Sequence, residues 1–105
     1  MKTLNLTDKV LIYLLENYKR NNNSSNASFA AVASNFSKHE ESQLIDAVTK
    51  LKTDGFIEIM YYDSKPGSIF VMLSALRQTK EDAFAEKGYN SYSEIMNIIL
   101  PSKKK

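Results

Sequence analysis

The chain has 105 residues, with 14 basic and 12 acidic side chains, 43% hydrophobic residues and no cysteine. This length and apolar content predict one domain with a modest hydrophobic core, and they argue against extended disorder. The lack of cysteine excludes disulfides, cysteine nucleophiles and cysteine-bound metal. A net charge of +2 gives no overall argument for nucleic-acid binding, so such a function needs local evidence. Asp8, Lys9 and Glu16 interrupt the first apolar stretch. We therefore expect a cytoplasmic protein without a signal peptide or a membrane span.

The first half of the chain predicts two helices. Apolar residues at helical spacing indicate a helix that Thr7 caps and that ends near Arg20. The polar run Asn21–Asn26 then predicts a solvated connection, with a functional loop as the alternative. Ser28 begins a short helical segment that runs from Phe29 to Phe36.

The third helix has the strongest pattern. Ser37 and Glu40 have the spacing of a capping box, which predicts that this helix begins at Lys38. Gly55 is a natural left-handed C-cap at its other end. The inner face would carry four apolar residues at helical spacing, Leu44, Ala47, Val48 and Leu51.

A β-hairpin is predicted next. Residues 56–63 and 68–74 are rich in β-branched and aromatic side chains. The dipeptide Pro66-Gly67 between them fits the two central positions of a type II turn. Downstream, Thr79 would cap a helix over residues 80–87 that ends at Gly88.

A last helix is predicted by a second capping box, Ser91 to Glu94, and would end before Pro101. Five apolar residues within Ile95–Leu100 exceed what one amphipathic face can bury. One face would pack on the first helix, and the other would suit a twofold partner. We therefore expect a homodimer, with an interface formed by Ile95, Ile98 and Ile99.

The order of helix, short helix, turn, longer helix, glycine and hairpin is the layout of a winged helix-turn-helix. The stretch Leu51-Lys-Thr-Asp-Gly55-Phe56-Ile57 resembles the end of the recognition helix and the start of the wing in winged-helix transcriptional regulators. This resemblance covers roughly residues 4–73, and the segment after the wing is similar to small phage- or plasmid-associated bacterial proteins of this type. It implies an α+β fold, mostly α with a β-hairpin. The expected organisation is a single domain over 1–100, with a core at 4–74, extra helices at 79–100 and a disordered basic tail at 101–105.

The resemblance implies sequence-specific binding to double-stranded DNA, with the third helix in the major groove. Gln43 is suited to adenine, Ser42 and Thr49 to base edges or phosphates, and the lysines to phosphates. The wing tip would contribute Ser64 and Lys65. The expected DNA-binding residues are Lys38, His39, Ser42, Gln43, Asp46, Thr49, Lys50 and Lys65. The protein would regulate transcription by occupying its site, without catalysis, metal or cofactor.

The third helix departs from the family pattern in its charge. It carries three lysines and four carboxylates, and no basic residue lies near Asp46. Because phosphate neutralisation supplies most non-specific affinity, two alternatives stay open. The domain could bind a protein partner through the acidic face and Ile45, or it could be a replication or partition adaptor. The aromatic residues Tyr61, Tyr62 and Phe70 have three possible roles, which are packing in the core, exposure on the wing and stacking on bases.

The sequence has no Gly-rich phosphate loop, no Ser/His/Asp set and no carboxylate cluster, so we do not expect an enzyme. His39 is the only histidine, and without cysteine it favours a phosphate contact or plain exposure over a metal site. Glu40 and Glu41 are interpreted as a helix cap and a solvated first-turn carboxylate.

Overall fold

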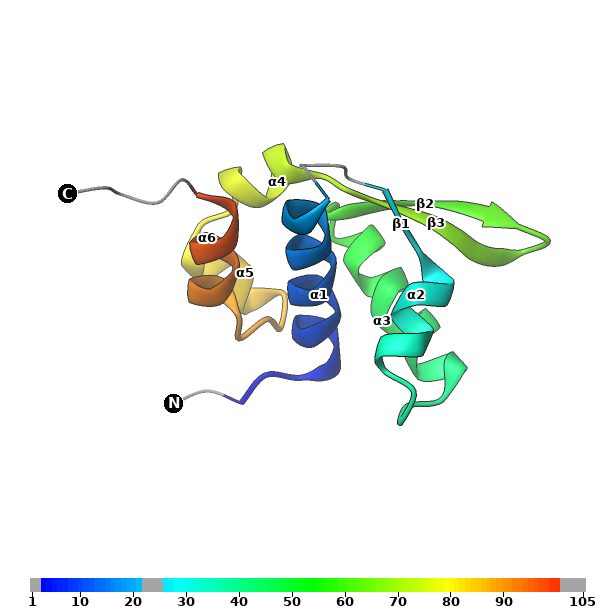
Figure 1. The fold of residues 1–105 in the computed structure, drawn as a ribbon. Coiled ribbons are helices and arrows are strands. Elements are labelled where there is room, and N and C mark those ends of the chain that lie inside the picture. Colours follow the sequence, from blue (N-terminus) through cyan, green and yellow to red (C-terminus); the bar gives the residue numbers. More distant parts are fainter. Residues whose placement is uncertain (1–2, 22–25, 101–105) are drawn as a thin grey trace.

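The computed structural model describes residues 3–21 and 26–100, which form six helices and a three-stranded antiparallel sheet (Figure 1). Helix α1 stands in the middle, with α2 and α3 on one side and α5 and α6 on the other. The hairpin of β2 and β3 projects beyond the helices. This layout confirms the expected α+β class and is compatible with a winged-helix arrangement. The elements are α1 Leu6–Arg20, β1 Asn26–Ser28, α2 Phe29–Asn35, α3 Glu41–Thr53, β2 Ile57–Tyr62, β3 Lys65–Val71, α4 Leu73–Gln78, α5 Glu81–Glu86 and α6 Tyr92–Ile99.

Helix α1 is capped by Asn5, so the prediction of Thr7 as the cap is wrong. The Asn5 Oδ1 accepts a hydrogen bond from the Asp8 N–H at 2.9 Å, and the Asp8 Oδ2 accepts one from the Asn5 N–H at 3.0 Å. This reciprocal capping box satisfies two backbone donors, whereas Thr7 lies inside the first turn. The helix ends at Arg20, and α2 begins after Ser28, both as predicted.

Helix α3 begins at Glu41, three residues later than predicted, because residues 36–38 form a turn after α2. The predicted box of Ser37 and Glu40 is therefore wrong. Instead the Gln43 Oε1 accepts a hydrogen bond from the Glu40 N–H at 2.9 Å. The four inner-face residues are buried as predicted. Gly55 has φ +86° and ends the helix, and the Phe56 N–H donates to the Leu51 carbonyl at 3.0 Å.

The hairpin is present, but its turn lies at Asp63 and Ser64. Both residues have positive φ, 52° and 66°, as a type I′ turn requires. The predicted turn at Pro66-Gly67 is wrong, because these residues lie within β3, where the register with β2 shifts between Met60 and Tyr61. Primed turns match the right-handed twist of paired strands, and this geometry prevails over the Pro-Gly pattern.

The polar run before α2 contributes a strand that the sequence pattern did not predict. β1 pairs with β3 in antiparallel register, with Ala27 opposite Ile69, so the sheet order is β1-β3-β2. Residues 22–25 of the predicted solvated connection, and the predicted disordered tail at 101–105, lie outside the described residues.

The segment after β3 holds three helices instead of the predicted two. Strand β3 ends at Val71, and the apolar residues that follow belong to α4. Thr79 does not cap α5, because its hydroxyl donates to the Ala75 carbonyl at 2.8 Å and so closes α4. Gly88 has φ +97° and ends α5 as predicted, and α6 ends before Pro101.

Ser91 precedes α6, but it does not form the predicted capping box with Glu94. Its buried hydroxyl donates to the Asp8 Oδ1 at 2.7 Å, and the Asn90 N–H donates to the same oxygen at 3.0 Å. We call Asp8, Asn90 and Ser91 the clasp, because they fasten the α5–α6 connection to the start of α1. Asp8 has no exposed surface, so these donors replace its hydration.

A single cluster of buried residues joins the elements. It includes the apolar face of α1, the inner face of α3 and the inward residues of the sheet. An aromatic group continues it toward the last helices, since the Phe84 ring lies 5.4 Å from Phe56 and 4.7 Å from Tyr89. None of the helices in the described ranges has the length and apolarity needed to span a bilayer.

Candidate nucleic-acid interface

The outer face of α3 carries a stripe of short polar side chains. Ser42, Asp46, Thr49 and Thr53 follow one another at spacings of four, three and four residues, and all are exposed. Because 3.6 residues make a turn, this spacing places them in one line along the helix. We call these four residues the polar stripe. It lies opposite the buried inner face, so the packing of α3 turns the stripe to solvent.

Gln43 lies beside the polar stripe and is exposed, but its side chain already has a structural role. Its carbonyl oxygen caps α3 through the Glu40 N–H. The side-chain amide N–H₂ is still free to donate, since capping uses the acceptor atom. The predicted bidentate contact with adenine needs both groups, so it would require the cap to open.

The Lys50 side chain reaches toward the C-terminal helices. Its Nζ lies 2.9 Å from the Asp54 Oδ2 and 5.0 Å from the centre of the Tyr89 ring. The Tyr89 hydroxyl donates to the same Asp54 oxygen at 2.7 Å. Burial, together with Asp54, raises the pKa of the Tyr89 phenol far above its ordinary value. The i, i+4 spacing of Lys50 and Asp54 signals the ion pair, whereas the part played by Tyr89 depends on tertiary contact.

Lys38 and His39 lie in the turn before α3. They therefore lie next to the N-terminal end of α3, where the polar stripe begins. Both are exposed, and with Asn35, Phe36 and Ser37 they line a shallow hollow of about 190 Å³. The His39 ring lies 6.5 Å from the Phe36 ring. The structure thus places two of the predicted residues next to the stripe.

The hairpin presents Lys65 directly after its turn, exposed as predicted. It also presents exposed apolar side chains, with Met60 at 49%, Tyr61 at 44% and Tyr62 at 56% of full exposure. The Lys52 Nζ lies 5.8 Å from the centre of the Tyr61 ring, which joins the hairpin to the last turn of α3. Phe70 is half-buried. The sequence pattern singled out Tyr61, Tyr62 and Phe70 but left open which of them would be exposed.

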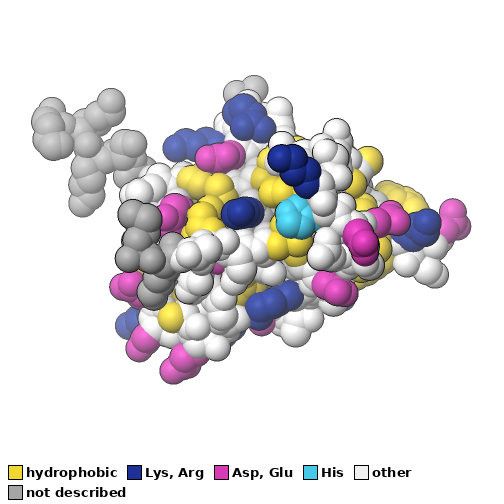
Figure 2. Space-filling view, turned by 90° about the horizontal axis from the view of Figure 1, so that it is seen from below, with side chains coloured by type: hydrophobic (Ala, Val, Ile, Leu, Met, Phe, Trp, Pro, Cys, Tyr) yellow, Lys and Arg dark blue, Asp and Glu magenta, His cyan; other side chains and the backbone are white. Residues whose placement is uncertain are grey.

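The charge on this side of the molecule is mixed. Residues 37–65 contain four lysines and six carboxylates, and one lysine is paired with Asp54. Figure 2 shows acidic and basic side chains interspersed on the face that it presents. This surface therefore has no positive field that would attract phosphates from a distance.

The predicted dimer residues separate in the structure. Ile95 is fully buried and Ile99 is 8% exposed, and both belong to the core. Ile98 is half-buried beside α1, where it lines an open groove with Glu16, Lys19, Arg20 and Asn97. Thus α6 covers most of its apolar surface within one copy of the chain.

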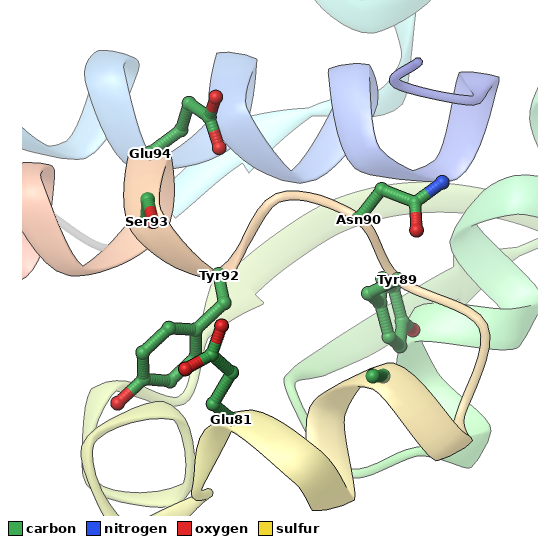
Figure 3. Close-up of a pocket in the computed structure, with 7 residues that line it drawn as sticks. Glu81, Tyr89, Asn90, Tyr92, Ser93 and Glu94 are labelled. Carbon is green, nitrogen blue, oxygen red and sulfur yellow. The ribbon is translucent and has the colours of Figure 1, made fainter. Parts of the chain in front are cut away.

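A further hollow, of about 260 Å³, lies between α5 and α6. Glu81, Tyr92 and Glu94 are among its lining residues (Figure 3). The side chains of Glu94 and Asn90 point to different sides instead of into a common space. Within residues 3–21 and 26–100, no three His, Asp or Glu side chains gather as a metal site.

Comparisons of the chain with known proteins found no matching family model, curated protein or solved structure.

Proposed function

We propose that the protein binds double-stranded DNA, with α3 in the major groove and the β2–β3 hairpin against the adjacent backbone or minor groove. It would act as a regulator by occupying its site. The polar stripe is the observation that carries this proposal. Its side chains are short, so the helix axis can approach the base edges closely, and hydroxyls can both donate and accept hydrogen bonds.

Two structural features support this proposal. The inner face of α3 is buried along its whole length, which fixes the rotation of the helix about its axis. Its last turn is held by Asp54, which accepts from both Lys50 and Tyr89. A reading helix held at both its inner face and its end loses little conformational entropy on binding.

The charges predict how such binding would behave. Asp46 lies in the middle of the stripe, where a carboxylate can accept a hydrogen bond from the cytosine amino group. It also repels phosphates. Apart from Lys50, which pairs with Asp54, the lysines near the stripe and the wing are Lys38, Lys52 and Lys65. We therefore expect weak non-specific affinity for DNA and a preference for particular sequences.

Selection from a randomised pool of DNA duplexes tests this proposal. The wild-type protein should enrich a common sequence, whereas a variant with Ser42→Glu and Thr49→Glu should enrich none, because two added carboxylates would face the groove. Ala85→Glu with Ser93→Glu is the matched control, since it adds the same charge at exposed positions on α5 and α6. Equal enrichment by the wild type and the stripe variant would contradict the proposal.

The second candidate is a protein-interaction module. The observation that favours it is the group of exposed apolar side chains on the hairpin, Met60, Tyr61 and Tyr62. Aromatic residues and methionine are enriched in protein interfaces. If the wild type shows no salt-sensitive binding to any duplex at about 50 mM salt, the DNA proposal fails and this candidate replaces it. Ile45, which was also considered as a partner contact, is half-buried and packs against the core.

The homodimer stays a prediction. With Ile95 and Ile99 in the core, a partner could contact only Ile98 among the three predicted residues. Sedimentation equilibrium tests it directly. A mass that stays near the 11.9 kDa of one chain at high micromolar concentration would contradict the dimer.

A further inference from the structure

A group of exposed cations lies away from α3. Lys19 and Arg20 lie in the last turn of α1, and Arg77 lies in the last turn of α4. The Arg77 guanidinium donates to the Ile99 carbonyl at the end of α6, at 3.5 Å. Lys19 and Arg20 line the open groove with Asn97 and Ile98 of the same helix. The end of α6 therefore lies between the cations of α1 and that of α4.

We call Lys19, Arg20, Arg77 and Asn97 the basic end. Figure 1 shows the last turns of α1 and α6 together with α4 at the end of the fold opposite the α2–α3 turn. All four side chains are exposed. In the described part of the chain, the one ion pair joins Lys50 to Asp54, so these three cations are not neutralised by carboxylates.

The balance of charge differs between the two surfaces. Glu16 is the one carboxylate among the residues that line the groove. The basic end and Glu16 thus carry three cations and one carboxylate, whereas residues 37–65 carry four lysines and six carboxylates. The net charge of +2 is therefore unevenly distributed over the molecule.

We propose that the basic end is a second binding surface, which takes the phosphate backbone of duplex DNA. Lysine and arginine side chains spread over an open groove fit a row of phosphates along a strand better than one enclosed anion. The exposed amide of Asn97 can add a neutral donor. This proposal does not rest on the reading function of α3, because the two surfaces share no residue.

Other occupants fit less well. A membrane surface would need a contiguous apolar face. Here Ile98 is half-buried, and the exposed apolar residues Leu100 (46%) and Met72 (40%) lie at the ends of different helices. A second copy of the chain related by a twofold axis would bring Lys19 and Arg20 near their own counterparts. Like charges brought together in this way disfavour the contact, and this repulsion also argues against the predicted homodimer through Ile98. Phosphates are the occupant with complementary charge.

A binding titration with a labelled random-sequence duplex tests the proposal. Lys19→Gln with Arg20→Gln should lower the affinity roughly tenfold at about 50 mM salt, and should flatten the slope of log affinity against log salt by about 1.8. The matched control is Lys9→Gln with Lys87→Gln, which removes two exposed cations elsewhere. Equal losses in both pairs would mean that only net charge matters, and would overturn the proposal.

The same variants separate this surface from other roles. Cations in the last turn of a helix also stabilise the helix dipole. If the Lys19/Arg20 variant unfolds at a lower temperature but binds DNA like the wild type, the role is structural and the proposal is wrong. It is also wrong if the pair changes the sedimentation mass without changing DNA binding, or if polyglutamate or anionic vesicles bind as tightly as the duplex.

Failure of the α3 proposal would be distinguishable. In the background of Ser42→Glu and Thr49→Glu, sequence enrichment reports on α3, whereas the salt slope on random duplex reports on the basic end. If this variant loses sequence enrichment but keeps the salt slope on random duplex, both proposed binding surfaces are supported. A slope that is unchanged by Lys19→Gln with Arg20→Gln overturns the basic end whatever α3 does.

Discussion

On one side of α1 lie α2, α3 and the hairpin, and on the other lie α5 and α6 (Figure 1). The first side meets α1 through apolar side chains such as Leu51 and Val48, which belong to one buried cluster. The second side adds polar contacts between distant residues, with Asp8, Asn90 and Ser91 buried or half-buried around one carboxylate. Apolar packing tolerates small shifts, whereas a buried carboxylate needs each of its donors in place. The two sides should therefore respond differently to substitution.

The largest effect is expected from the apolar side. Leu51→Ala should lower the free energy of unfolding by about 2–5 kcal/mol, because Leu51 is fully buried between α3 and the rest of the core. Chemical denaturation measures it. Thr49→Ala, on the exposed face of the same helix, is the control and should change stability by no more than about 0.5 kcal/mol. A loss below about 1 kcal/mol for Leu51→Ala would remove the basis for the assigned inner face.

The clasp should give the next largest effect. Asp8→Ala removes the acceptor of the Asn90 N–H and the Ser91 hydroxyl and breaks the capping box with Asn5, so we expect a loss of about 3 kcal/mol. Hydrogen exchange should show faster opening at residues 88–92 than in α3. A double-mutant cycle with Ser91→Ala should reveal coupling between the two residues. Independent effects would show that the clasp does not act as a unit.

Tyr89 connects the two sides, since its hydroxyl reaches Asp54 at the end of α3. Tyr89→Phe keeps the aromatic stack and should cost about 1–2 kcal/mol at neutral pH. Burial holds the pKa of the folded phenol above its ordinary value of 10.0. The stability from Tyr89 is thus fully present below pH 10 or so and falls above it, as the unfolded chain releases the proton.

The difference in unfolding free energy between the wild type and Tyr89→Phe should depend on pH, and this dependence sharpens the test. Above about pH 10, the wild-type advantage over Tyr89→Phe should shrink by up to about 1.4 kcal/mol per pH unit. Denaturation at several pH values measures this difference, and subtraction removes the contribution of the other tyrosines and the lysines. A constant difference across this range would contradict the raised pKa.

The hairpin tip should show the smallest effect, in the stabilising direction. Ser64 has φ 66°, a conformation that glycine adopts without strain. Ser64→Gly should raise the free energy of unfolding by about 0.5 kcal/mol, as expected for a type I′ turn. Gly67→Ala is the contrasting variant, because a Cβ there would collide with the Tyr62 ring. A destabilising Ser64→Gly would place the turn elsewhere, for example at the Pro66-Gly67 position.

The sequence correctly indicated the parts of the fold that depend on local periodicity. The inner face of α3, its end at Gly55, the short helix after Ser28 and the end of α5 at Gly88 all follow from residue spacing and from glycine's access to positive φ. These signals operate within one or two turns of helix. They need no knowledge of which segment packs beside them.

Helix starts were predicted poorly because several hydrogen-bond partners compete for each short polar side chain near a helix start. Ser91 has the spacing of a cap, yet its hydroxyl bonds to Asp8, which lies 83 residues away in the chain. Thr79 likewise bonds back to Ala75. A short polar side chain has several possible partners, and the sequence does not say which of them the fold brings near.

The same distinction between local sequence pattern and tertiary contact applies to the candidate surfaces. The sequence determined that α3 exposes a polar face, since the apolar stripe fixes which side is buried. It did not determine that the Tyr89 hydroxyl would join the pair of Lys50 and Asp54, or that Ile95 would lie in the core. Only the tertiary structure decided these, and it also brought Lys19, Arg20 and Arg77 to one end of the molecule. The physical reason is that periodicity reports the direction in which a side chain points, whereas its partner depends on how the helices pack.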